Sequence, residues 1–211
     1  MNRVNVQSYV PSVHTYLGIQ LLFPEDLEYD RRYPLLVLLH GRGKGRGQWE
    51  HMVYLEDLVD EKKIFVAMPQ GNQSAFVNLM SGERWGDFLN RELPDLLSGW
   101  FPIRTEREGR GVLGVDTGGY GALRAAEGYA LQGAVRPVCD LADLYETDYR
   151  PDPQVLFGPK EDLARNGYPV LSWKEARGSS CLREQMQAAL RDVVKLSLIH
   201  ISEPTRLQLS S

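Results

Sequence analysis

Short apolar runs alternate along this chain with longer segments that have helical spacing. The apolar runs are at 34–40, 63–69, 112–115 and 131–138. Runs of this length, bounded by turn residues, predict strands that are buried on both faces of a parallel sheet. Strands that alternate with helices in this order indicate an α/β protein with a doubly wound sheet and right-handed crossovers.

The spacing of apolar residues between these runs predicts the helices. The expected helices cover 49–59, 85–101 and 120–129, and two more follow at 172–176 and 182–194. Pro94 falls inside the second of them. Because proline lacks a backbone donor and its ring clashes with the preceding turn, we expect a kink or a break there.

The first part of the chain follows a different pattern. Apolar and polar residues alternate at 4–9 and again at 16–22, with a break at Pro11-Ser12. Alternation with a period of two residues predicts half-buried strands, and the short break predicts that they are antiparallel. We therefore expect two antiparallel strands at one edge of a mostly parallel sheet.

The segment 114–121, Gly-Val-Asp-Thr-Gly-Gly-Tyr-Gly, joins a predicted strand to a predicted helix. A strand that enters a helix through small-x-nucleophile-x-Gly has the pattern of a nucleophile elbow. Gly114 and Gly118 are needed because Cβ atoms would collide with neighbouring backbone in so tight a turn. The central residue, Asp116, is expected at positive φ, which aspartate tolerates better than most residues. The frame of a catalytic site is therefore present, with a carboxylate where a serine is expected.

The site is expected at one edge of the sheet. Ligands of doubly wound sheets bind at the carboxyl ends of the strands. His40 and Gly41 follow one predicted strand, and Asp116 follows another. We therefore expect these residues to line a common cleft.

Composition excludes several classes of partner. The chain has 211 residues, of which 43% are hydrophobic and 25% charged, and a formal net charge of −4. This fits a single globular domain, and the acidic balance gives no general attraction to nucleic acid or anionic membranes. No apolar run approaches the roughly 20 residues that span a bilayer, and the polar N-terminus has no export signal. We expect a cytoplasmic protein without nucleic-acid or membrane partners.

The cysteines and acidic residues show no metal chemistry. Cys139 and Cys181 have neither metal-type nor redox-type spacing, so a reducing compartment is the default and a disulfide is the alternative. No cluster of histidine, cysteine and aspartate has the spacing of metal ligands. We therefore expect no metal site.

The end of the chain needs separate treatment. Residues 196–206 resemble a translated transposase adapter of the kind used in shotgun DNA libraries. We expect the natural frame to end near Val194 or Lys195, with 1–195 as one domain and 196–211 as a non-native tail. His200 is therefore not a catalytic candidate. The alternative is a genuine polar extension.

Several separated motifs together resemble the esterase D family of α/β hydrolases. In chain order these motifs are 33–41, Met68-Pro69, 81–83, Phe88, 92–94 and 114–123. The family includes S-formylglutathione hydrolases, tributyrin-type esterases and related mycolyltransferases. The resemblance covers residues 4–161, and several motifs agree in order, which is more specific than an elbow alone. It implies an α/β-hydrolase fold, a small-molecule ester or thioester substrate, a Ser-Asp-His triad, and no metal or organic cofactor.

Carried over residue by residue, the resemblance puts Asp116 in the nucleophile position. It implies that Thr117 offers a backbone N–H to the oxyanion hole, and that the loop after His40-Gly41 offers a second donor from Arg42. Such donors meet negative charge as it develops, and each is worth about 3–4 kcal/mol in serine hydrolases.

Two departures from the family pattern put this activity in question. Asp116 replaces the serine, and the triad acid and histidine, which come later in the family, have no counterpart before Val194. We therefore expect an incomplete domain that lacks its last strands. The strand at 131–138 would then be an exposed sheet edge, which predicts dimerisation or aggregation.

Asp116 has three interpretations. The chain could be a catalytically silent member, it could hydrolyse esters in an altered form, or Asp116 could be the nucleophile. In the last case the carboxylate would displace halide or open an epoxide, as in dehalogenases and epoxide hydrolases. That chemistry also needs a histidine to activate water, and neither His14, His40 nor His51 is expected to serve. The missing base favours a silent or impaired member.

The loop after His40 adds a fourth interpretation. Arg42, Lys44 and Arg46 alternate with glycines, but the spacing fits neither the dinucleotide fingerprint nor the Walker pattern. These cations could instead pair with Asp116 or bind an anionic substrate. The chain would then be a non-catalytic binding scaffold for small acyl or anionic ligands.

Four further residues have structural interpretations. Trp49 and Trp85 are expected in core packing, and Cys139 as a small buried hydrophobic residue. Asp140 comes one strand too early for the triad acid of the family, so we expect it to be a turn or cap residue.

Overall fold

The computed structural model describes residues 1–172. The predicted helix at 182–194, Cys181, His200 and the tail 196–211 lie outside the described residues. Only the first residue of the helix predicted at 172–176 is described.

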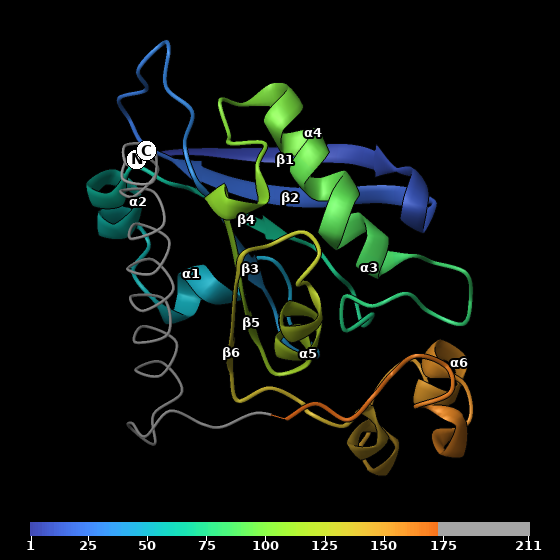
Figure 1. Cartoon of the computed structure of the whole chain (residues 1–211). Coiled ribbons are helices and arrows are strands. Elements are labelled where there is room, and N and C mark those ends of the chain that lie inside the picture. Colours follow the sequence, from blue (N-terminus) through green and yellow to red (C-terminus); the bar gives the residue numbers. More distant parts are fainter. Residues whose placement is uncertain (173–211) are drawn as a thin grey trace, which may run out of the picture.

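One mixed sheet of six strands organises the described part of the chain, in the order β1-β2-β4-β3-β5-β6 (Figure 1). The strands are β1 (Asn2–Val10), β2 (Thr15–Phe23), β3 (Leu35–Leu39), β4 (Phe65–Pro69), β5 (Arg110–Val115) and β6 (Leu131–Val135). β1 and β2 are antiparallel, β2 runs antiparallel to β4, and the remaining neighbours are parallel. The predicted fold class, with its antiparallel edge strands, is confirmed.

The sequence pattern of each strand follows from its burial. Every residue of β3, β4 and β5 is buried, which explains why these strands are unbroken apolar runs. Along β1, exposed and half-buried residues alternate, because one face of this edge strand meets solvent. A short 3₁₀ turn (Pro11–Val13) joins β1 to β2 at the predicted break.

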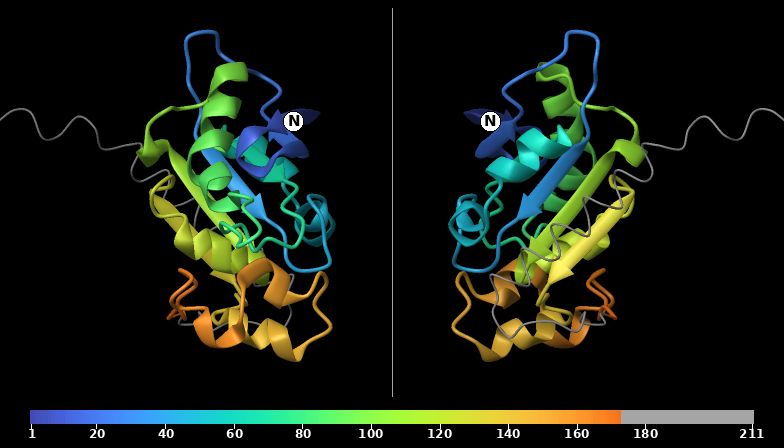
Figure 2. Two further views of the ribbon diagram at one scale, coloured as in Figure 1. Left: turned by 90° about the vertical axis from the view of Figure 1, so that its right-hand side faces the viewer. Right: turned by 90° about the vertical axis from the view of Figure 1, so that its left-hand side faces the viewer.

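Helices cover both faces of the sheet (Figure 2). Trp49, from α1 (Gln48–Met52), and Val59, from α2 (Glu56–Lys62), pack in a core on one face of the sheet. Phe88, from the helical run 85–100, and Tyr120, from α5 (Thr117–Arg124), pack in the larger core on the other face. The sheet is therefore the middle of three layers.

The helix predicted at 49–59 is two helices, α1 (Gln48–Met52) and α2 (Glu56–Lys62). The chain leaves the helical path at Val53, whose φ is −139° and ψ is 156°. Val53 and Leu55 are both buried in the core beside α1 and α2. A continuous helix was the wrong prediction here because burying both side chains outweighs helical periodicity.

The helix predicted at 85–101 forms in three parts, α3 (Trp85–Asp87), a π-helical turn (Phe88–Glu92) and α4 (Leu93–Trp100). Pro94 lies in the first turn of α4. Proline cannot donate to Asn90 O, and a wider turn directly before it is a known response to such a missing bond. The predicted disturbance at Pro94 is therefore a π-helical turn within a run that continues.

Helix α5 (Thr117–Arg124) begins directly after Asp116, so its predicted bounds of 120–129 were wrong at both ends. Its early start uses glycines that let the first turn press against the sheet. Its early end lets Tyr129 turn into the core, where the ring is fully buried and the hydroxyl donates to Leu89 O at 2.9 Å.

The region after β6 has little regular structure, as expected. It holds a 3₁₀ segment (Leu141–Glu146), a short helix α6 (Pro153–Phe157) and a 3₁₀ turn (Lys160–Asp162). Within residues 1–172, no helix is long and apolar enough to cross a bilayer. Among the same residues, β6 pairs only with β5, and the expectation that this edge drives dimerisation remains a prediction.

Candidate active site

Asp116 lies at the turn between β5 and α5, with φ 54° and ψ −121°. This is a sparsely populated conformation for a residue with a side chain, and such strain is typical of functional turns. A Cβ on Gly114 would lie 2.1 Å from Gly118 O, and a Cβ on Gly118 would lie 2.3 Å from His40 O. Only glycine fits at either position, so the local sequence sets the tight turn that presents Asp116.

Arg42 holds the carboxylate of Asp116 through its backbone and its side chain. The backbone N–H of Arg42 donates to Asp116 Oδ2 at 2.8 Å. The guanidinium adds Nε at 3.0 Å from Oδ2 and Nη2 at 2.9 Å from Oδ1. This paired, charge-assisted geometry is the strongest form of arginine–carboxylate contact. The side-chain bond to Asp116 raises the pKa of Arg42, so the guanidinium stays charged.

Gly41 lets the loop come this close to Asp116. A Cβ on Gly41 would lie 2.9 Å from Asp116 Cβ and 3.0 Å from Asp116 Oδ2. The N–H of Gly41 donates to Gln48 Oε1 at 2.7 Å, which ties the start of the loop to α1. The backbone donor of Arg42 is therefore fixed in position by its neighbours as well as by the ion pair.

His40 is buried beneath this loop and both its ring nitrogens are engaged. Nε2 accepts from the backbone N–H of Gly71 at 2.9 Å, so the proton lies on Nδ1, which donates to Gly41 O at 2.9 Å. Burial lowers the pKa of His40, which keeps the ring neutral. In this arrangement neither nitrogen can take a proton from an attacking group, and the histidine serves to join two loops.

Thr117, the other expected donor of the oxyanion hole, is the first residue of α5 and is buried. Its backbone N–H belongs to the first helical turn, where amides have no acceptor within the helix. The structure thus brings His40, Gly41, Arg42, Asp116 and Thr117 together at the carboxyl ends of β3 and β5.

Comparison with known proteins decides the family at this point. A family model described as Putative esterase matches residues 11–195. The chain belongs to this esterase family. The resemblance expected from the sequence motifs is therefore confirmed at the level of the family.

Curated esterases match part of the chain. Esterase Rv1288 of Mycobacterium tuberculosis (strain ATCC 25618 / H37Rv) is 32% identical over 119 residues, 53% of this chain and 26% of that protein. An acetyl esterase of Caldicellulosiruptor saccharolyticus is 31% identical over 90 residues, 42% of this chain and 34% of that protein. The matches thus span about a quarter to a third of these relatives.

Solved structures share the fold. The serine hydrolase FphF of Staphylococcus aureus, described as fluorophosphonate-binding, aligns with a TM-score of 0.65 and 23% identity, over 74% of this chain and 66% of that chain. The S-formylglutathione hydrolase FrmB of the same organism aligns with a TM-score of 0.69 and 18% identity, over 93% and 98%. At these identities the comparison establishes the α/β-hydrolase fold of this esterase-family chain.

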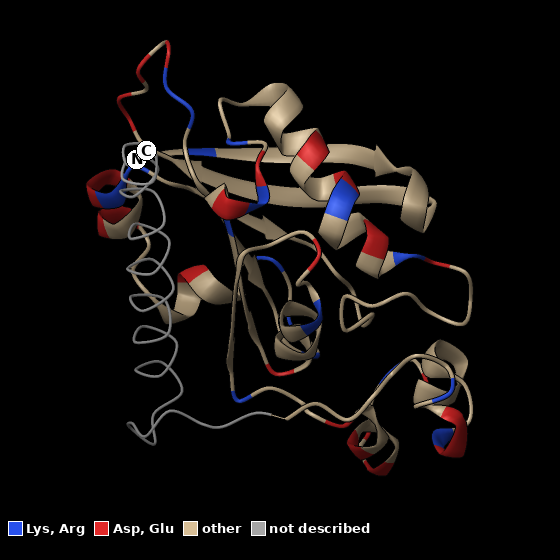
Figure 3. Ribbon diagram, viewed as in Figure 1, with Lys and Arg blue, Asp and Glu red and all other residues tan. Residues whose placement is uncertain are grey.

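The cations of the loop 41–47 point in different directions. Arg42 contacts Asp116, whereas the guanidinium of Arg46 lies over Gly18 of β2, and the backbone N–H of Arg46 donates to Gln70 Oε1 at 3.2 Å. The two guanidinium groups do not converge on one point, so they do not form a phosphate cradle together. Figure 3 shows that charged residues lie mainly on helices and loops around the sheet.

Two residues beside the ion pair were missed by the sequence analysis. Gln73 Oε1 accepts from the N–H of Gly43 at 3.3 Å, and Tyr149 donates its hydroxyl to Gln73 O at 2.7 Å. Burial raises the pKa of Tyr149, and the nearby charge of Asp116 raises it further. No motif marks either residue, because each lies in a loop whose path depends on tertiary packing.

No histidine among the described residues is placed to act as a base beside Asp116. His14 follows the first 3₁₀ segment, and His51 lies in the last turn of α1. Neither they nor His40 is hydrogen-bonded to Asp116. Residues 1–172 also contain no group of histidine, cysteine and acidic side chains that could hold a metal ion.

The remaining candidates have structural positions. Asp140 accepts from Ala142 N at 2.9 Å and caps the following 3₁₀ segment, as expected. Trp49 and Trp85 are buried in the core, also as expected. Cys139 is half-buried, in contrast to the prediction of a buried residue, because it follows the sheet and lies in an irregular segment.

Proposed function

We propose that this chain has the substrate class of its family, small carboxylic esters or thioesters, but that its hydrolytic activity is impaired or absent. The observation that supports this is the contact between the backbone N–H of Arg42 and Asp116 Oδ2. In the family pattern that donor would stabilise the oxyanion of a tetrahedral intermediate. Here Asp116 Oδ2, in place of that oxyanion, accepts the hydrogen bond from this donor.

The cost of this substitution has two parts. A carboxylate beside the oxyanion position repels the charge that develops there, and it also occupies one donor. Loss of one such donor costs about 3–4 kcal/mol of transition-state stabilisation, or two to three orders of magnitude in rate. Asp116 also lacks a hydrogen-bonded histidine among residues 1–172, so no described base activates a nucleophile or water.

Direct attack by Asp116 is less favourable than hydrolysis by a serine. A carboxylate that attacks an acyl ester gives a mixed anhydride, whereas attack on an alkyl halide gives an alkyl ester with loss of halide. The bidentate bond from Arg42, with Nε to Oδ2 and Nη2 to Oδ1, draws electron density from both oxygens and lowers their nucleophilicity. At most a single alkylation would follow, because hydrolysis of the resulting ester again needs a base.

A second candidate function is supported by the same ion pair. The backbone and side-chain donors of Arg42 form a site shaped for a carboxylate. If Asp116 moves aside, an acyl or other carboxylate ligand could take this position. The chain would then bind anionic ligands without turning them over.

Hydrolysis of p-nitrophenyl acetate tests the first proposal. The wild-type chain and Asp116→Ser should both show no turnover above a heat-denatured control, since restoring the hydroxyl does not restore a base. Turnover by the wild type would overturn the claim of silence. Turnover by Asp116→Ser alone would show that the chain retains a functional base. A stoichiometric, non-catalytic label at Asp116 after treatment with an alkyl halide would favour the aspartate nucleophile.

A further inference from the structure

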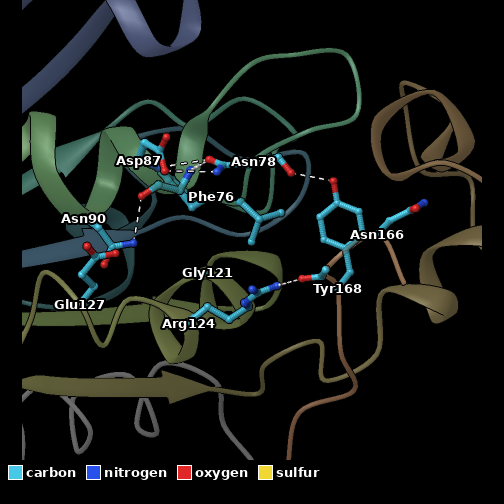
Figure 4. Close-up of a pocket in the computed structure, with 12 residues that line it drawn as sticks. Phe76, Asn78, Asp87, Asn90, Gly121, Arg124, Glu127, Asn166 and Tyr168 are labelled. Atoms are coloured by element: carbon cyan, nitrogen blue, oxygen red, sulfur yellow. Dashed lines mark hydrogen bonds between the residues drawn. The ribbon is translucent and has the colours of Figure 1, made fainter. Parts of the chain in front are cut away.

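Away from Asp116, a cavity of about 340 Å³ lies beside α5, and its walls are bonded to one another (Figure 4). The hydroxyl of Tyr168 donates to Asn78 O at 2.6 Å, and the guanidinium of Arg124 donates to Gly167 O. These bonds hold the walls together and use polar groups that a ligand would need. The outer edge of β1 differs, because no strand among residues 1–172 lies beside it.

β1 forms one end of the sheet (Figure 1). It pairs with β2 over its whole length, from Asn2 opposite Phe23 to Val10 opposite Thr15, with no bulge in the register. Along an antiparallel strand, alternate residues direct their backbone N–H and C=O groups to opposite sides. Half of the backbone groups of β1 therefore point away from the sheet and can pair with another strand.

β1 lacks the features that usually keep an edge strand unpaired. Such strands are short, bulged, interrupted by proline or rich in charge. β1 has nine residues and no proline, and its single charged residue, Arg3, is paired with Glu50 at 2.7 Å. The other edge strand, β6, has only five residues. β1 is therefore the longer template for strand addition.

The sequence of β1 is self-complementary in an antiparallel pair. Two identical strands related by a two-fold axis place one residue opposite itself, and Val6 is the middle residue of β1. With the axis at Val6, all nine residues are paired, and Asn2 lies opposite the partner's Val10. Val6 is half-buried and packs against the larger core. Contact with the partner's Val6 would extend that core across the axis.

This register also places no like charges opposite each other. Arg3 would lie opposite the partner's Tyr9, and Tyr9 is 48% exposed. A guanidinium beside an exposed tyrosine ring can form a favourable cation–π contact. Asn5 would lie opposite the partner's Gln7, which pairs two exposed amides.

We propose that β1 binds a second copy of this chain by antiparallel strand addition about a two-fold axis at Val6. The two sheets then become one continuous sheet. The proposal goes beyond the proposed function and does not depend on it, because β2, β4 and β3 separate β1 from β5, the strand that precedes Asp116.

Sedimentation velocity of the full chain over a range of concentrations tests the proposal, with two double variants of exposed residues. We expect the wild type to form a dimer that dissociates on dilution. Asn5→Lys/Gln7→Lys places like charges opposite each other twice and should raise the dimer dissociation constant about tenfold. Asn5→Lys/Gln7→Glu is the matched control, because it places opposite charges at the same positions and should keep the dimer.

Disulfide cross-linking tests the register, in a chain whose Cys139 and Cys181 are both replaced by serine. Directly opposite residues of an antiparallel pair have Cα atoms about 4.5–5.5 Å apart, within the range of a disulfide. Val6→Cys should therefore cross-link two copies on oxidation. Val4→Cys should not, because it lies opposite the partner's Ser8.

Each result supports or overturns the proposal. A dimer that is weakened in Asn5→Lys/Gln7→Lys, kept in Asn5→Lys/Gln7→Glu and cross-linked by Val6→Cys supports it, provided that the thermal transitions are retained. A folded wild type that stays monomeric at its highest soluble concentration would overturn it. A dimer that is equal in both double variants, or one that Gln132→Lys on β6 dissociates, would place the interface elsewhere. Equal cross-linking of Val4→Cys would overturn the register.

Discussion

His40 and Asp116 lie at the ends of neighbouring parallel strands but differ in their exposure and in their hydrogen-bond partners. His40 is 2% exposed and bonds to the backbone on both sides, whereas the Asp116 side chain is 25% exposed and bonds to Arg42. Replacing the first should therefore disturb the fold, and replacing the second should disturb only the chemistry. Under the proposed function, the buried residues that support the site belong to the frame of the esterase family, and Asp116 occupies the position of its reacting group.

Substitution of Gly118, where the ends of β3 and β5 pack together, should lower the free energy of unfolding the most. In Gly118→Ala the new Cβ would lie 2.3 Å from His40 O, a contact with backbone that cannot be relieved by a rotamer change. We expect a loss of about 3 kcal/mol or more in the free energy of unfolding, measured by urea denaturation. Gly99→Ala is the matched control, because its Cβ would meet no atom within 4 Å and α4 should gain stability. Equal effects of the two substitutions would show that the elbow is not tightly packed.

His40→Ala should have the second-largest effect on the free energy of unfolding. It removes two hydrogen bonds, leaves the Gly71 N–H buried without its acceptor, and opens a cavity beside Phe76. We expect a loss of about 2–4 kcal/mol in unfolding free energy. A loss below about 1 kcal/mol in the same urea measurement would contradict the role of His40 in joining the loops.

The buried imidazole should also give a pH dependence. Burial lowers the folded-state pKa of His40 below its ordinary value of 6.5, so the unfolded state takes up the proton first as pH falls. The contribution of His40 is therefore fully present above pH 6.5 and is lost toward its lower folded-state pKa, at up to about 1.4 kcal/mol per pH unit. His40→Gln should unfold with a shallower dependence between pH 7 and pH 5. Parallel curves for the two proteins would rule out His40 as the source.

Substitution of Asp116 should have the smallest effect on stability. A half-exposed ion pair contributes about 0–1 kcal/mol, and the strained φ of 54° disfavours any residue with a side chain. Asp116→Gly removes both, so we expect thermal unfolding to change by about 1 kcal/mol or less in free energy. A much larger loss would mean that the ion pair holds the loop 41–47 and that Asp116 belongs to the frame.

The parts of the molecule that sequence predicts best are those fixed by local rules. Strands β3, β4 and β5 are buried on both faces, and their composition shows it directly. The tight turn before α5 is marked in the sequence by Gly114 and Gly118, because a Cβ at either position would collide with neighbouring backbone.

What sequence could not predict depends on contacts between distant segments. The turn at Val53 serves the burial of nearby side chains, and Tyr129 leaves its helix to reach Leu89. The family resemblance predicts that Arg42 offers its backbone N–H. Pairing with Asp116 is one of several interpretations of the loop cations. Arg42 binds Asp116 through both its backbone N–H and its guanidinium because Gly41 lets the loop approach Asp116 closely. The spacing of residues along the chain does not reveal this approach.

The central claim is that Asp116 occupies the donors of Arg42, and NMR of the Arg42 Nε–H resonance during an acetate titration tests it most directly. In the wild type we expect no response, because the internal carboxylate is already bound. In Asp116→Gly the resonance should shift and saturate as acetate fills the vacated position, and Arg42→Ala identifies the signal by its loss. An equal response in the wild type, or no response in a folded Asp116→Gly protein, would contradict the claim.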